Sequence, residues 1–423
     1  MNPLLVGSAP PASPPQGQAP APAAAAPGVS PVNLKPKKGI SNAVKVMIAV
    51  TLLALIILAA VIFKGKSDNN EWIERRNAIV AYFNDLENPP TEIPMTGDDV
   101  GQLLGELASS ETRNDNEREL YFRALSIAKA TDGSDIGEMV ANFAKDSERV
   151  ESATRVKLFR VTGRRAEASA LPSLIAFASQ TDDTTSGQAA LTAASKMASI
   201  SNFQSLLGII ANSPNASIKS SARMVLSKVI ADSEDPSKYA TPVIASYKSV
   251  ADPDSSAALL RLMGSAGGDE AADLVADQLE SKQETMKVAA ALALSDWPDD
   301  SQFETLLEYT KSEGTDRLRS KAFEALVDFL KICPNIDPDD RSFYWNDVAA
   351  IASGEVEQRR VIRAMSEQDG RWADDILDYF IENADSNKVR AAAEVAKDRL
   401  DVRLRRAERS GTTKEDDKKD DDE

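Results

Sequence analysis

The sequence predicts an all-α protein of about nine helix-turn-helix repeats, preceded by one transmembrane helix. Three observations support this fold class. A short pattern recurs between residues 97 and 401: an apolar residue, Lys or Arg, two variable residues, then Ala. Aromatic residues make up only 5% of the 423 residues, which disfavours a sheet and suits closely packed helices. Upstream of the repeats lies an apolar run without a charged residue.

The N-terminal tail, residues 1–42, is rich in Pro and Ala, and its first 31 residues carry no charge. Such a segment cannot bury enough apolar surface to fold, so we predict a disordered, partly polyproline-II tail. It could act as a spacer or as a docking peptide for a Pro-recognising groove. No regularly repeated PxxP motif occurs in it, which favours the spacer.

Residues 43–63 are predicted to cross a membrane. The run 46–63 is uncharged, and with Ala43, Val44 and a snorkelling Lys45 it reaches the ~20 residues that span a bilayer. A cleaved signal peptide is the alternative. The run lies far from the N-terminus, however, and no A-x-A site follows it directly, so a single-pass anchor is favoured.

The orientation of this anchor rests on a weak charge difference, because Lys and Arg flank the run on both sides. We predict a bacterial inner-membrane protein with its N-terminus in the cytoplasm and its repeats outside the cytoplasm. A repeat region that faces the cytoplasm is the alternative.

Residues 64–96 connect the anchor to the repeats. Helical spacing of Ile73, Ile79, Val80 and Phe83 predicts a helix there, and the Pro pair at 89–90 ends it. This helix would cap the first repeat, because an end repeat otherwise exposes an apolar face.

The repeats occupy residues 97–401 and are about 34 residues long. First helices carry paired apolar residues, from LLGEL at 103 to ILDYF at 376. Gly, Pro and Asp separate the helices, as turns and caps require. The second-helix pattern is clearest in IKSSA at 218–222, MKVAA at 286–290, LRSKA at 318–322 and VRAAA at 389–393.

These motifs resemble the HEAT-repeat family of stacked antiparallel helix pairs. In that family an acidic turn residue commonly precedes the basic residue of the second helix, and Asp316 before Arg319 fits this arrangement. Gly187 and Asp254 depart from it, because a basic residue would be expected at each position. The resemblance implies a right-handed α-solenoid that binds proteins, with its second helices on the concave side.

Second helices carry many cations, which suggests a concave basic ladder for an acidic protein segment or a phosphate-bearing ligand. The alternative is that the cations bond to neighbouring repeats and hold the stack. Regular spacing favours this alternative for residues 219, 287, 319 and 390. The candidate partner-binding residues are Arg223, Arg319, Arg360 and Arg363.

The composition argues against an enzyme, a metal site and a cofactor. The chain has no His and a single Cys, Cys333, so a thiolate zinc site and a His-activated nucleophile are excluded. The DPDD segment at 337–340 lacks the spacing of a calcium loop. A net charge of −17 argues against nucleic acid. Residues 402–423 form a charged C-terminal tail, which ends in KEDDKKDDDE.

The sequence therefore predicts a membrane-anchored scaffold or adaptor that presents a helical surface to a protein partner, where tethering would raise the occupancy of a weak partner. The alternatives are a cytoplasm-facing regulatory subunit of a membrane complex and a passive envelope spacer.

Overall fold

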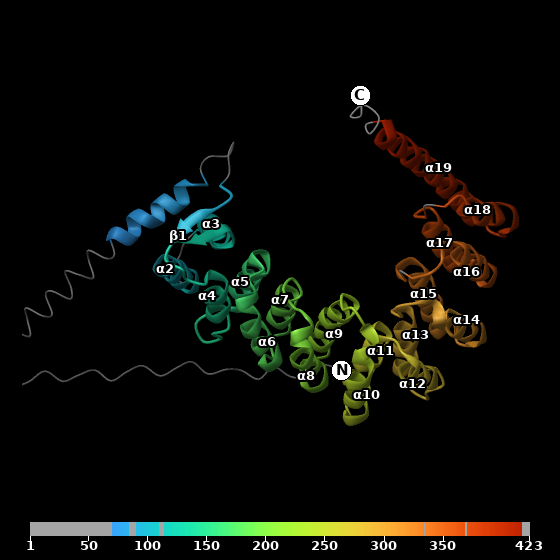
Figure 1. Ribbon diagram of the computed structural model, residues 1–423, viewed down its shortest axis with the longest axis horizontal. Helices are drawn as coiled ribbons and strands as arrows, with labels where there is room; N and C mark the ends of the chain where they lie inside the picture. Colours follow the sequence, from blue (N-terminus) through green and yellow to red (C-terminus); the bar gives the residue numbers. More distant parts are fainter. Residues whose placement is uncertain (1–69, 84–89, 110–113, 334, 369, 417–423) are drawn as a thin grey trace, which may run out of the picture. The chain divides into compact units, whose positions relative to one another are not determined.

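The computed structural model describes residues 70–83, 90–109, 114–333, 335–368 and 370–416 (Figure 1). The chain divides into two units, Met1–Asp68 and Asn69–Glu423, and every described residue belongs to the second. The predicted tail at 1–42 and the predicted transmembrane run at 43–63 lie outside the described residues.

The described chain is almost entirely helical, which confirms the all-α prediction (Figure 1). Within the described residues, helices α2 to α19 form nine consecutive pairs, and second helices pack on the second helices of adjacent pairs from α3 to α19. The first helices are α2 (Gly97–Ala108), α4 (Ile136–Ala144), α6 (Leu171–Gln180), α8 (Phe203–Asn212), α10 (Ala240–Ser249), α12 (Asp269–Leu279), α14 (Phe303–Ser312), α16 (Pro338–Ile351) and α18 (Trp372–Asn383). The second helices are α3 (Asp115–Ile127), α5 (Ser152–Arg165), α7 (Thr184–Ala194), α9 (Ala216–Ala231), α11 (Pro253–Ala266), α13 (Glu284–Ser295), α15 (Asp316–Ile332), α17 (Gly354–Met365) and α19 (Asn387–Asp416).

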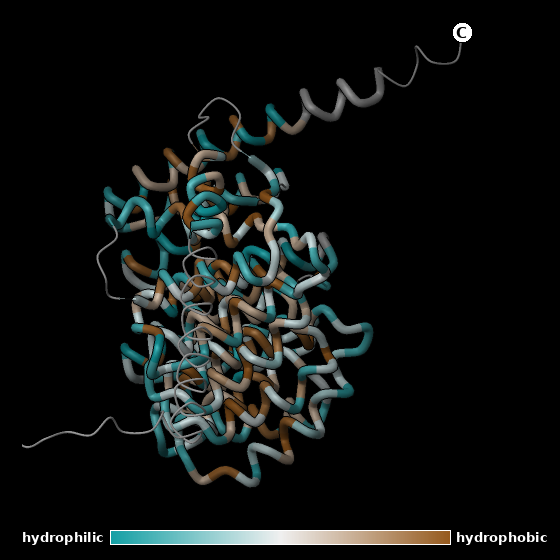
Figure 2. The backbone as a smooth tube through the Cα atoms, turned by 90° about the vertical axis from the view of Figure 1, so that its left-hand side faces the viewer, coloured by the Kyte–Doolittle hydropathy of each residue, from teal (hydrophilic) through white to brown (hydrophobic). Residues whose placement is uncertain are grey.

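The recurring residues of the sequence form the core between these helices. The Ala of the second-helix pattern is fully buried at 222, 290, 322 and 393, because a small side chain lets neighbouring helices approach closely. Leu103, Leu206 and Leu306 of the first helices are also fully buried, and each contributes roughly 1.5–3 kcal/mol on burial. Figure 2 shows hydrophobic residues (brown) recurring among hydrophilic ones (teal) along the helices.

Several helices begin at the polar residues that the turns contain. Backbone N–H groups in the first turn of a helix have no acceptor within the helix. In α4, α7 and α9 the side chains of Asp135, Asp183 and Asn215 accept hydrogen bonds from such groups. Between α11 and α12 the chain turns at Gly267 and Gly268, whose φ angles of +69° and +91° favour glycine.

A two-stranded sheet was not predicted. Strands β1 (Ile93–Met95) and β2 (Ala128–Ala130) pair in parallel, with Ile93 opposite Ala128. The low aromatic content is an average over the whole chain, so it does not reveal two strands of three residues each.

Residues 70–81 are helical, within the connecting region where a helix was expected. Ile79 and Phe83 are buried as predicted, whereas Ile73 is partly exposed and Trp72 takes the buried position. The Trp72 indole Nε1 donates to Glu106 Oε1 of α2 at 2.8 Å, and Arg75 pairs with Asp99 at 2.7 Å. This helix therefore covers α2 through both apolar and charged contacts.

The predicted location in a bacterial inner membrane, with one membrane pass and the repeats outside the cytoplasm, is contradicted. In the part of the chain that the structure describes, no helix is both long and apolar enough to cross a bilayer. The longest described helix, α19, has 30 residues but carries charged side chains along its length.

Helix α19 also continues past the boundary that was expected after residue 401. It extends to Asp416. Just past residue 401 it is supported by the buried Leu404 and by Asp401, which pairs with Arg405 one turn later at 3.6 Å.

Candidate protein-interaction site

Arg319, one of the four candidate binding residues, joins two consecutive helix pairs. It projects from α15, and its guanidinium donates to the carbonyl oxygens of Thr310 at 2.7 Å and Ile351 at 2.8 Å. Its Nη2 also lies 3.1 Å from Oε2 of Glu357 in α17, a carboxylate that is largely buried. The guanidinium is therefore occupied by contacts within the stack.

Other second helices make comparable contacts with the pair that follows. Arg155 of α5 reaches the Asp183 carboxylate at 3.3 Å, and Lys287 of α13 reaches Glu313 at 3.4 Å. Lys219 of α9 pairs with Asp252, which caps α11. We call these cation contacts between consecutive pairs the rungs. Arg390 differs, since it contacts Asn387 of its own helix.

We expect the contribution of the Lys219–Asp252 rung to stability to depend on pH. Hydrogen bonding from Lys219, and then from Ser255, lowers the pKa of Asp252 to about 2. A carboxyl with a lowered folded-state pKa adds stability above its ordinary value of 3.8, and this stability is lost as the pH falls toward 2. Because the carboxylate is half exposed, solvent screening reduces the gain.

We expect Asp252→Asn, which keeps a good helix cap, to be less stable than the wild type at pH 6 and equally stable near pH 2. Urea midpoints measured between these values would check this. A difference that stays constant over the range would show that the charge of Asp252 contributes nothing.

Arg223 lies in a groove of about 530 Å³, formed by α9, α11, α13 and α15. Its buried guanidinium is 3.7 Å from the carboxylate of Asp296, and Arg261 is 3.6 Å from the same carboxylate. Burial raises the pKa of Asp296, while burial and the charge of Arg261 lower the pKa of Arg223 to about 10. Arg223 and Arg261 thus share the single carboxylate of Asp296. With that carboxylate ionised, the cluster carries a net positive charge at a partly buried position.

The rim of this groove, which we call the α9–α15 groove, carries two large apolar side chains. Met224 is 55% exposed and Ile332 is 65% exposed. Sequence reasoning found Arg223 but missed Asp296, Arg261 and these two apolar residues. These residues lie on different helices and in one turn, so no repeating pattern in the sequence connects them.

Arg360 and Arg363 lie elsewhere, on α17. Arg360 is 3.4 Å from Glu324 of α15, and the exposed Arg363 is 3.7 Å from Glu367 one turn later. The structure therefore does not gather the four predicted residues: only Arg223 lines the α9–α15 groove.

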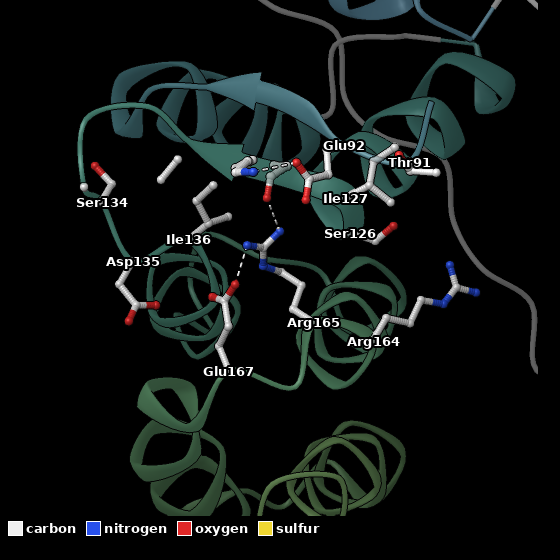
Figure 3. Close-up of a pocket in the computed structure, with 14 residues that line it drawn as sticks. Thr91, Glu92, Ser126, Ile127, Ser134, Asp135, Ile136, Arg164, Arg165 and Glu167 are labelled. Atoms are coloured by element: carbon white, nitrogen blue, oxygen red, sulfur yellow. Dashed lines mark hydrogen bonds and ion pairs between the residues drawn. The ribbon is translucent and has the colours of Figure 1, made fainter. Parts of the chain in front are cut away.

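A second pocket, of about 560 Å³, lies beside β2 and α5 (Figure 3). Arg165 donates to the carbonyl oxygens of Leu125 at 2.9 Å and Ala128 at 2.7 Å, and it pairs with Glu167. Lys129 pairs with Glu92 at 2.8 Å. Most charges in this pocket are thus compensated by one another, which gives a ligand little to bind. Arg164 extends apart from them, and no interaction joins it to the other residues drawn.

Among the described residues, no group of three or more His, Cys, Asp or Glu side chains is placed to hold a metal ion. Cys333 is buried beside the α9–α15 groove, and burial raises the pKa of its thiol, which disfavours the reactive thiolate.

Comparison with known proteins identifies no relative by sequence. No protein-family model matches the chain, and no curated protein matches it. Among solved structures, the chain is similar to one described as "Computational Design of Self-Assembling Cyclic Protein Homooligomers", at 12% identity over 73% of this chain and 92% of that chain. The TM-score is 0.11, which carries no argument for fold or assembly. The resemblance to HEAT repeats therefore stays a prediction.

Proposed function

We propose that the chain is a scaffold or adaptor whose helix pairs form a HEAT-like α-solenoid, and that the α9–α15 groove binds a protein partner. Consecutive pairs share a hydrophobic core and are joined by the rungs, which is how stacked repeats are stabilised by their neighbours. Such a stack offers surface and grooves along its second helices.

The observation that carries this proposal is the position of Met224 and Ile332. Two large exposed apolar side chains flank one groove whose base contains the paired Arg223 and Asp296. Interfaces commonly combine an apolar centre with a few charged groups, and Met adapts readily to a partner surface. Burial of both side chains by a partner would remove their apolar area from water.

A site-specific photo-crosslinker tests the proposal. We expect the same discrete crosslinked partner from positions 224 and 332, and none from position 356. Val356 of α17 is the matched control, since it is apolar and 72% exposed but does not line the groove. Met224→Asp should abolish crosslinking from position 332, because it places a charge in the apolar contact. Equal crosslinking from all three positions, or from none, would reject the groove as the binding surface.

A further inference from the structure

Three exposed cations face a groove between α5 and α7: Arg160, Arg164 and Lys196. Their side chains make no ion pair or hydrogen bond with any residue that the structure describes. The contrast lies within one helix, because Arg155 and Arg165 of α5 are both paired with acids. Figure 3 shows Arg164 apart from the Arg165–Glu167 pair.

The groove, which we call the α5–α7 groove, encloses about 560 Å³. Val156, Ala189 and Ala193 supply apolar lining. The two helices touch at its base, because a Cβ added at Gly163 would lie only 3.0 Å from the Cα of Ala193. The site is therefore a groove with an apolar floor and cations on α5 and at the end of α7.

The unpaired cations have an energetic cost for the free protein. Arg160 and Arg164 are one helical turn apart, and like charges at this spacing destabilise a helix. The chain has 66 acidic and 49 basic residues, so carboxylates that could pair with these cations are abundant. A bound anion would remove this repulsion.

The chemistry of the groove favours carboxylates on a peptide. The guanidinium group of an arginine can bind a carboxylate through two parallel hydrogen bonds. Lys196 adds a third positive charge to those of Arg160 and Arg164. The apolar floor suits an aliphatic side chain between the acids, which a free phosphate lacks. None of the residues that line the groove is aromatic, so bases of a single-stranded nucleic acid would find no stacking platform there.

We propose that the α5–α7 groove binds an acidic peptide segment of a partner protein, with Asp or Glu on Arg160, Arg164 and Lys196 and an aliphatic side chain on the floor. This inference rests on the proposed scaffold function and assigns it a second, separate binding site.

The test measures fluorescence anisotropy of a labelled peptide that alternates Asp or Glu with Leu, titrated with the full chain. We expect the triple variant R160Q/R164Q/K196Q to bind at least about tenfold more weakly. The matched control K238Q/K248Q/K311Q removes the same charge from exposed cations that have acidic partners and line neither groove, and should change affinity less than about twofold. Affinity should also fall between about 50 and 300 mM salt.

Folding is checked by thermal unfolding, and the single variant Arg164→Gln covers the case in which the triple variant is unstable. Equal weakening by the two triple variants, or equal binding of a peptide with Asn and Gln in place of the acids, would overturn the proposal. So would full displacement by inorganic phosphate, or binding of phosphatidylserine vesicles that the triple variant loses, because either assigns the cations to phosphate groups.

The crosslinking experiment separates this inference from the proposed function. Crosslinking from positions 224 and 332 without peptide binding would reject the α5–α7 groove and retain the scaffold. Loss of both would remove both proposals.

Discussion

Gly264→Ala is expected to destabilise the chain by about 3 kcal/mol, at the upper end of overpacking effects. A Cβ at this position of α11 would lie 2.0 Å from the carbonyl oxygen of Ala293 and 2.9 Å from its Cα. Both are backbone atoms of α13, so no side chain can rotate away, and the two helices must separate. Urea unfolding, followed by circular dichroism, would measure the loss.

Gly208→Ala is the matched control, since Gly208 also lies inside a helix, α8, but a Cβ there meets nothing within 4 Å. Because Ala restricts the unfolded chain and favours a helix, we expect a gain of roughly 0.5–1 kcal/mol. If both variants were destabilised alike, the close approach of α11 and α13 would not be the cause.

Arg319→Met should cost about 3 kcal/mol, the lower end of the range for breaking a buried ion pair by removing one partner, because the Arg319 side chain is itself 20% exposed. The change leaves the Glu357 carboxylate without its cation, and it removes the donors to two backbone carbonyls. Arg317→Met, two residues earlier on the same helix, should cost less than about 1 kcal/mol. The side chain of Arg317 is 83% exposed, and its contact with Glu284 lies in solvent.

A double variant distinguishes a buried charge from lost packing. Arg319→Met with Glu357→Met should recover part of the loss, since no unpaired carboxylate remains. Strictly additive costs would mean that Arg319 acts through its carbonyl contacts alone. Chemical denaturation of the four proteins gives the coupling free energy.

The sequence predicted the features of the fold that repeat. Ala222 and Ala322 are buried because each occupies the same place in its helix pair, and periodicity makes such positions visible. Lys219 and Lys287 were expected to bond neighbouring repeats for the same reason, and both reach acids of the next pair. Trp72 and the short strands were missed because each occurs once.

The candidate sites could be predicted only in part. Arg223 stood out as a cation in a second helix, but its partner Asp296 comes from a turn two pairs later in the chain. Arg160 and Arg164 of the α5–α7 groove looked no different in sequence from Arg155 or Arg165 of the same helix. The difference is in the folded structure, where, among the described residues, acidic side chains lie next to Arg155 and Arg165 but not next to Arg160 and Arg164.

The rungs also bear on how the chain would respond to a pulling force. From α9 onward, cations of α9, α11, α13 and α15 are ion-paired with acids of the next pair. Between α7 and α9, by contrast, Asn215 donates to Thr184, a hydrogen bond between two uncharged side chains. We therefore expect tension to open the α7–α9 junction before the four junctions that follow α9, α11, α13 and α15. This junction lies between the α5–α7 groove and the α9–α15 groove. Mechanical load would therefore change the spacing of the two proposed sites before it unfolded either of them.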